Sequence, residues 1–282
     1  MSPQTTRSRK EEAARRSGAR LRRAALLRAP YVAAILLLAL PSISAPPAPR
    51  VPVVVELFTS EGCSSCPPAD AFLAQLDRTQ PVAGAEVIPI EEHVDYWNRF
   101  GWRDPFSSAE ITERQQEYAR RLRISGPYTP QMVVDGRAQF SGNAGSEVGD
   151  AIAAAAKAPR IEIGLAVASG PPDWKVTAGI LVNEIPRSTP ETLDVYLAVT
   201  EDGLASMVSA GENSGRHLVH TSVLRRLGKV GSIRPGEAFR TQKHIALDRD
   251  WKRDNLRVVA FLAGSKTGHI VGAGATRIPR QH

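Results

Sequence analysis

The two cysteines of this 282-residue chain stand close together, as Cys63 and Cys66 in the stretch EGCSSCPP. A C-x-x-C pair can exchange disulfides through a thiolate, form a static disulfide, or bind a metal through two soft sulfur ligands. A static disulfide here would close a very small ring. It would stabilise the fold little, because the effect grows with the logarithm of loop length. The spacing therefore favours redox exchange, and the two alternatives stay open.

The positive charge of the chain is confined to its beginning. Residues 1–30 hold nine Lys or Arg and two Glu, which accounts for the whole formal net charge of +7. The remaining residues hold 27 Lys or Arg and 27 Asp or Glu, so their charges cancel. A neutral body has no basic field to attract phosphate. We therefore expect no nucleic-acid partner.

The same N-terminal segment has the pattern of an export signal. Residues 1–44 combine a long basic region, an apolar run at residues 31–40 and small residues, Ser42 and Ser44, before an expected cleavage point. A membrane-spanning helix needs roughly 20 apolar residues, so this run is short for an anchor. We expect an exported protein, periplasmic or secreted, in which a disulfide can persist. It would contact the membrane only if the signal is not cleaved.

Strand and helix patterns alternate after a proline-rich spacer at residues 45–50. Buried strands are predicted at residues 51–58 and 86–94, and a hairpin at residues 131–140 turns at Asp135-Gly136. Apolar residues at helical spacing predict helices at residues 68–78, 107–123 and 146–158, the second opened by a capping box from Ser107 to Glu110.

From residue 159 onward the pattern changes. Short, mostly alternating segments separated by Gly, Pro, Asp and Asn predict an antiparallel β-sandwich or barrel. Residues 215–228 interrupt this pattern as a helix or a long strand. The sequence thus predicts an α/β domain at residues 51–158 followed by a β-rich domain at residues 159–282.

Two stretches carry a family resemblance. ELFTSEGCSSCPP resembles the strand, C-x-x-C and helix that open thioredoxin-like folds, and YTPQMVVDGRAQFSG resembles their closing Thr-Pro, strand, turn and strand. With HVDYWNRFGWRDPF between them and a β-rich tail behind, the body resembles the secreted family catalogued as domain of unknown function 1223. The resemblance implies a thioredoxin-like N-terminal domain and an export route, but no established reaction.

This resemblance implies roles for the cysteines and for one acid. Cys63 would be the attacking thiolate, stabilised by the free N–H groups of the helix start, and Cys66 would resolve the mixed disulfide. Glu56, on the first strand, would relay protons to Cys66, and burial would suit it to this role. Glu61 is expected to be exposed.

Residues opposite the cysteines would contact the substrate. The resemblance implies a cis peptide at Pro130, with Thr129 beside an extended substrate. Trp97 and Trp102 belong to an aromatic-rich stretch that would either pack as core or line a groove for a peptide or apolar ligand.

The leading hypothesis is thiol-disulfide exchange with exported protein thiols and an unknown redox partner. One alternative is a copper-binding module that uses Cys63, Cys66 and His93. Another is a non-catalytic binding protein on a thioredoxin-like scaffold. The leading hypothesis requires no cofactor and no metal. His217 and His220 are expected to be surface or core residues rather than ligands.

Overall fold

The computed structural model of the chain describes residues 49–170 and 174–279. The signal peptide expected at residues 1–44 therefore lies outside the described residues. Within the described ranges, no helix is long and apolar enough to cross a membrane.

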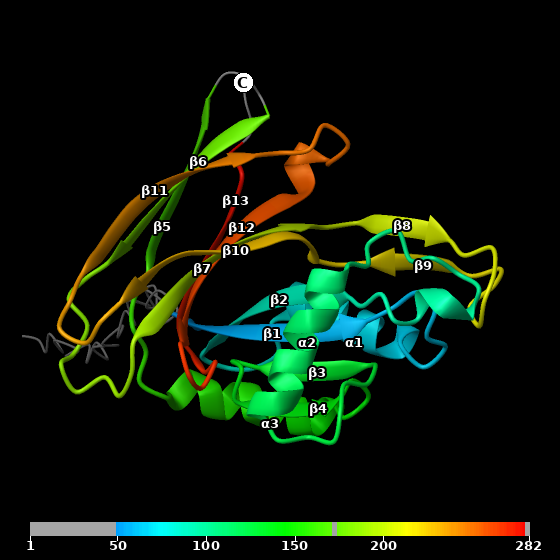
Figure 1. Ribbon diagram of the computed structural model, residues 1–282, viewed down its shortest axis with the longest axis horizontal. Helices are drawn as coiled ribbons and strands as arrows, with labels where there is room; N and C mark the ends of the chain where they lie inside the picture. Colours follow the sequence, from blue (N-terminus) through cyan, green and yellow to red (C-terminus); the bar gives the residue numbers. More distant parts are fainter. Residues whose placement is uncertain (1–48, 171–173, 280–282) are drawn as a thin grey trace, which may run out of the picture. The chain divides into compact units, whose positions relative to one another are not determined.

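The first part of the described chain follows the expected order of strands and helices (Figure 1). Its elements are β1 (Val51–Thr59), α1 (Pro67–Thr79), β2 (Ala85–His93), the 3-10 helix η1 (Asn98–Phe100), α2 (Ala109–Arg121), β3 (Gln131–Val134), β4 (Ala138–Ser141) and α3 (Gly145–Lys157). Asp135 and Gly136 both have positive φ, 47° and 61°, as the predicted hairpin turn requires. Helix α2 begins one residue later than the expected capping box, because Ser108 accepts the hydrogen bond from the backbone N–H of Ile111.

The second part consists almost entirely of strands. They are β5 (Gly164–Gly170), β6 (Lys175–Val182), β7 (Leu193–Glu201), β8 (Leu204–Met207), β9 (His217–His220), β10 (Val223–Ile233), β11 (Phe239–Ala246), β12 (Leu256–Gly264) and β13 (Ile270–Arg277), with the 3-10 helix η2 (Arg253–Asn255) before β12. The ambiguous segment at residues 215–228 contains two strands, β9 and the start of β10.

One large sheet joins strands from both parts. Its order is β13-β12-β7-β10-β2-β1-β3-β4, with β1 parallel to β2 and most other pairs antiparallel. The joint between the parts is narrow, because β10 pairs with β2 only through Val223 and Glu91. Two small antiparallel sheets, β11-β6-β5 and β8-β9, complete the architecture. The mixed α/β class is thus confirmed, and the boundary expected at residues 158/159 stays a prediction.

The faces of β1 pack against different helices. Val53, Val55 and Leu57 belong to a core with α1 and α3, whereas Val54 and Phe58 belong to a core with α2. Since side chains alternate along a strand, Glu56 is placed on the α2 face. A third core lies between the β11-β6-β5 sheet and strands β7 and β12.

Candidate functional site

Cys63 and Cys66 form a disulfide where the chain leaves β1 and enters α1. Cys66 directly precedes the helix, and both cysteines are fully buried. Ser64 and Ser65 between them are exposed. The hydroxyl oxygen of Ser65 lies 3.4 Å from the sulfur of Cys63. This hydroxyl and the positive end of the helix are placed to stabilise a thiolate, although Pro67 and Pro68 at the helix start have no N–H group to donate.

A loop from the second part of the chain covers this motif. Residues 208–216 connect β8 to β9, and the buried side chain of Asn213 donates hydrogen bonds to the carbonyl oxygens of Glu61 (2.8 Å) and Cys63 (2.9 Å). The backbone N–H of Ser64 donates to the carboxylate of Glu212 at 3.0 Å. Because both cysteines are fully buried, a substrate thiol reaches their sulfurs only after covering residues move.

The structure brings three of the expected substrate residues together. The Thr129–Pro130 peptide bond is cis, as the resemblance implies. The indole N–H of Trp97 donates to the hydroxyl of Thr129 at 2.7 Å. Pro130 lies near the first turn of α1, since a Cβ added at Gly142 would be 2.8 Å from Cβ of Pro130 and 2.6 Å from Cβ of Ala69.

Trp102 contacts Glu61, which we expected to be exposed. Its indole N–H donates to the carboxylate of Glu61 at 2.8 Å. Glu61 is fully buried rather than exposed, because Asn213 and His220 from the second part of the chain pack against it.

Glu56 makes its contacts on the α2 face of the sheet. Its carboxylate forms an ion pair with Arg114 and accepts a hydrogen bond from the hydroxyl of Tyr118. Proton relay by Glu56 stays a prediction; besides these two α2 side chains, the Glu56 carboxylate interacts with Glu92.

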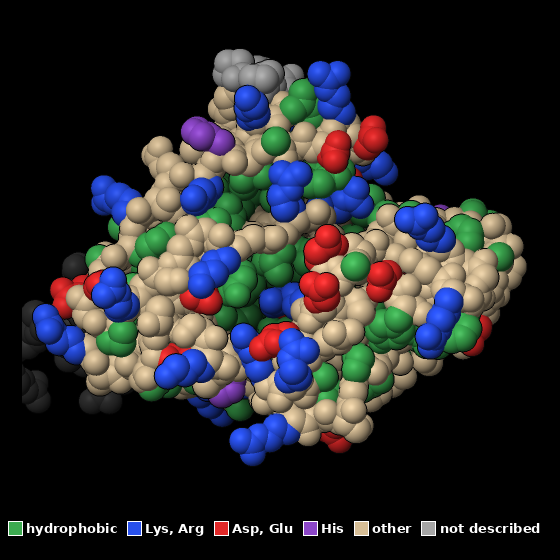
Figure 2. Space-filling view, in the orientation of Figure 1, with side chains coloured by type: hydrophobic (Ala, Val, Ile, Leu, Met, Phe, Trp, Pro, Cys, Tyr) green, Lys and Arg blue, Asp and Glu red, His purple; other side chains and the backbone are tan. Residues whose placement is uncertain are grey.

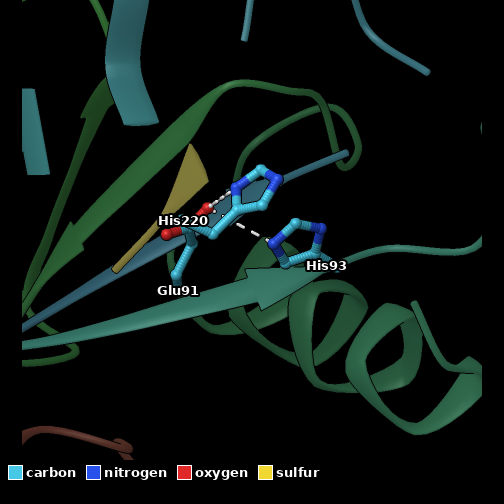
Figure 3. Close-up of side chains that lie close together, drawn as sticks. All are labelled: Glu91, His93 and His220. Carbon is cyan, nitrogen blue, oxygen red and sulfur yellow. Dashed lines mark hydrogen bonds and ion pairs between the residues drawn. The ribbon is translucent and has the colours of Figure 1, made fainter. Parts of the chain in front are cut away.

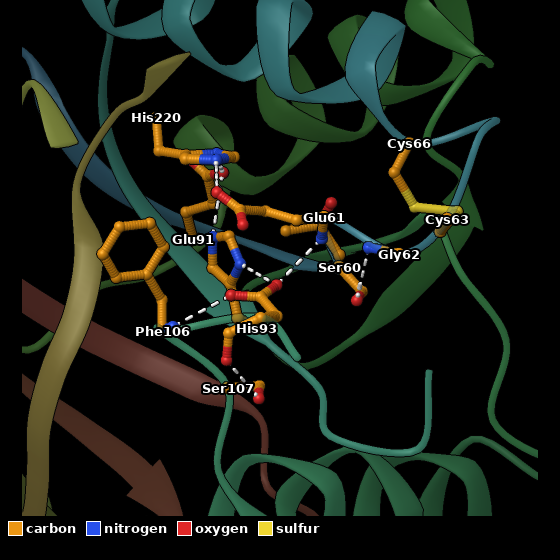
Figure 4. A network of polar contacts seen from close by, with 12 residues as sticks. Ser60, Glu61, Gly62, Cys63, Cys66, Glu91, His93, Phe106, Ser107 and His220 are labelled. Atoms are coloured by element: carbon orange, nitrogen blue, oxygen red, sulfur yellow. Dashed lines mark hydrogen bonds and ion pairs between the residues drawn. A yellow bond between two sulfur atoms is a disulfide. The ribbon is translucent and has the colours of Figure 1, made fainter. Parts of the chain in front are cut away.

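Beside the disulfide lies a buried polar network at the end of β2 (Figure 4). His93 Nδ1 lies 2.7 Å from Asp104 Oδ2, and His220 Nδ1 lies 2.6 Å from Glu91 Oε1. His220 Nε2 lies 3.1 Å from Glu61 Oε1, so the network reaches the residue two positions before Cys63. Among the described residues, the potential metal ligands that lie together with His93 are Glu91 and His220; the group includes neither cysteine, as the copper alternative would require.

Charges in the network shift one another's pKa values. Burial opposes ionisation of Glu91, but His220 and then His93 lower its pKa to about 2. Burial also opposes a charge on His220, but Glu91 and Glu61 raise its pKa to about 9. The buried pair is therefore held in its charged form near neutral pH.

Asp70 belongs to the same region and was not anticipated as a site residue. It lies one helical turn after Cys66, is almost fully buried, and accepts a hydrogen bond of 2.6 Å from the hydroxyl of Thr59. Burial, followed by the negative charge of Glu91, raises its pKa to about 7. The sequence holds one signal for it: Asp70 precedes Leu73 by three residues and so shares the apolar face of the predicted helix. Asn213 and Glu91 carry no comparable local signal.

Comparison with known proteins identifies a family and a fold. The family model described as "Protein of unknown function (DUF1223)" matches residues 54–263. No curated protein matches the sequence. A structural-genomics protein from Agrobacterium tumefaciens is 25% identical with a TM-score of 0.62, and the match covers 83% of this chain and 99% of that one. HBP35 of Porphyromonas gingivalis is 17% identical with a TM-score of 0.59, covering 81% of this chain and 76% of that one, which indicates a shared fold.

Proposed function

This chain belongs to the DUF1223 family, and we propose that it exchanges disulfide bonds with exported protein thiols through Cys63 and Cys66. The observation that carries the proposal is the position of the disulfide between β1 and the first turn of α1, near Pro130. The order β1-α1-β2-α2-β3-β4-α3 supports our interpretation of residues 51–158 as a thioredoxin-like domain.

In the oxidising direction, a substrate thiolate attacks Cys63 Sγ. The bond between the two cysteines breaks, and Cys66 leaves as a thiolate. A second substrate thiolate then attacks the substrate sulfur of the mixed disulfide and releases Cys63. The substrate gains a disulfide, and the cysteine pair takes up two electrons. The reverse sequence, begun by Cys63, reduces a substrate disulfide.

The residues around the cysteine pair stabilise the thiolate, contact the substrate and control its access. Ser65 and the helix N-terminus stabilise the Cys63 thiolate, which makes it the better nucleophile in the reduced protein. Trp97 and Thr129 contact the substrate chain beside Pro130. The loop at residues 208–216 opens to admit the substrate.

The reduction potential of the Cys63–Cys66 pair tests this proposal. We expect a value above about −300 mV, because structural disulfides in secreted proteins generally lie below it. The Cys66→Ser variant should trap a mixed disulfide with a thiol-containing protein, whereas Cys63→Ser should not. A potential below that limit, together with no trapped species in the folded Cys66→Ser variant, would reject thiol-disulfide exchange.

A further inference from the structure

Three side chains that commonly bind metals converge at the end of β2 (Figure 3). Glu91 and His93 are two residues apart on the strand and so point to the same face, while His220 comes from β9. One potential ligand atom from each residue lies within 4.8 Å of the other two, and all three residues are buried. We propose that these residues bind a divalent first-row transition-metal ion, with Zn²⁺ as the reference, without a cysteine ligand.

The surroundings of the imidazoles match those of metal-binding histidines. Each ring has one nitrogen near Glu91 and the other near a second buried carboxylate. His93 contacts Asp104 at 2.7 Å and His220 contacts Glu61 at 3.1 Å. In metal sites, such carboxylates fix the orientation of the ring and strengthen it as a ligand.

The Glu91 carboxylate and the His93 ring add two independent observations. Glu91 Oε2 accepts a hydrogen bond of 2.8 Å from the backbone N–H of Thr221, which fixes the carboxylate and leaves Oε1 directed at the rings. His93 Nε2 is buried and has no hydrogen-bond partner among the described residues, although it lies 3.3 Å from Glu91 Oε1. A metal ion between these atoms would satisfy this nitrogen, and it would displace the proton that His220 shares with Glu91 Oε1 in the metal-free protein.

The donor set selects the class of ion. Two imidazoles and one carboxylate suit Zn²⁺ and its first-row neighbours, whereas Mg²⁺ and Ca²⁺ prefer oxygen ligands. Three protein ligands leave a fourth position for water or another small ligand.

A cavity lies next to this site, separated from it by one aromatic ring. A hollow of about 510 Å³ lies between α2 and β10, and Figure 2 shows it as a recess with hydrophobic side chains. Phe106 lines this hollow, and the centre of its ring is 5.4 Å from that of His93 and 5.6 Å from that of His220. Phe106 thus forms the wall between the cavity and the two imidazoles.

Zinc titration of the chelator-treated protein, with its disulfide intact, tests this site. We expect one Zn²⁺ per chain by calorimetry, and at least a tenfold loss of affinity in His93→Gln and in His220→Gln. His217→Gln is the matched control, because His217 is exposed on the same strand as His220, and it should bind as the wild type does.

Nitrogen-15 spectra of the histidine rings in the wild-type protein make the test independent of whether the variants fold. Zn²⁺ should shift the resonances of the two buried rings before those of the exposed rings. Unchanged affinity in both folded variants would overturn the proposal. A wild-type protein whose buried rings do not respond to Zn²⁺ would overturn it as well.

Discussion

The side-chain amide of Asn213 donates a hydrogen bond of 2.9 Å to the carbonyl oxygen of Cys63, across a separation of 150 residues in the chain. The same amide binds the carbonyl oxygen of Glu61. Together with the Glu212 carboxylate, which accepts from the backbone N–H of Ser64, this side chain fastens the β8–β9 loop to the disulfide motif. We therefore expect the accessibility of the sulfurs to depend on this loop.

Removing this fastening should speed attack on the disulfide. Asn213→Ala removes two hydrogen bonds, each worth about 0.5–1.5 kcal/mol, so we expect dithiothreitol to reduce the disulfide roughly 5- to 150-fold faster. Mass spectrometry after alkylation measures the rate. Arg216→Ala, at an exposed position of the same loop, is the control. Equal rates in the two variants would show that the loop does not limit access.

Replacing Trp97 should separate substrate binding from sulfur chemistry. In Trp97→Phe the ring can no longer donate to Thr129, so we expect several-fold slower exchange with a protein substrate and little change with dithiothreitol. Trp251→Phe, in the second part of the chain, controls for the loss of an indole. A parallel loss of both reactions would instead indicate that Trp97 acts on the cysteines.

Asp70 should make stability depend on pH. In the folded protein Asp70 has a pKa of about 7, whereas in the unfolded chain it ionises near pH 4. The contribution of Asp70 to the free energy of unfolding therefore falls as the pH rises between these two values. Asp70→Asn cannot ionise and should therefore gain stability relative to the wild type across this window, by about 1–4 kcal/mol at pH 8. Urea unfolding at pH 4.5 and 8 measures the difference. Asp150→Asn, at an exposed position of α3, controls for the loss of a carboxylate, and a pH-independent effect of Asp70→Asn would contradict the prediction.

Asp104 should act on the metal site through His93. Removing a carboxylate that orients a ligating histidine commonly lowers metal affinity 10- to 100-fold, and we expect this loss of Zn²⁺ affinity in Asp104→Asn. The control is Asp95→Asn, because the Asp95 carboxylate accepts its hydrogen bond from Thr112 rather than from an imidazole. Identical Zn²⁺ affinities in the two variants would remove Asp104 from the site.

The space between Gly142, Pro130 and Ala69 of α1 has no room for an added methyl group. In Gly142→Ala the new Cβ would lie within 3 Å of Ala69 and Pro130, so we expect a loss of about 1–3 kcal/mol in the free energy of unfolding. Gly149→Ala, inside α3 with open space around it, should instead stabilise by about 0.5–1 kcal/mol. Chemical denaturation of both variants checks the pair of predictions, which fails if the two changes have the same sign.

Local patterns in the sequence were sufficient for most of the first part of the fold. Helix α1 begins and ends within one residue of its predicted range, and the Asp135-Gly136 turn occurs as expected, because neighbouring residues determine both. The break between β9 and β10 was not predicted. Ser222 there has a φ of 54°, a conformation that its side chain does not signal.

Only part of the candidate site could be predicted, because local sequence patterns do not show which distant residues pack against it. The spacing of Cys63 and Cys66 makes them recognisable in the sequence, whereas His220 and Asn213 come from a distant part of the chain. Glu61 shows the consequence: its position in a short polar stretch favours exposure, and the distant loop and strand bury it.

The order of the covering loop and the cysteines along the chain also affects how the protein is made. Synthesis proceeds from the N-terminus, so both cysteines exist before Asn213 and the rest of their cover have been added. At that stage the loop at residues 208–216 is not yet present to cover the thiols. Under the proposed function, easy access to the bond ends when residues 208–216 have been added and pack against residues 61–64.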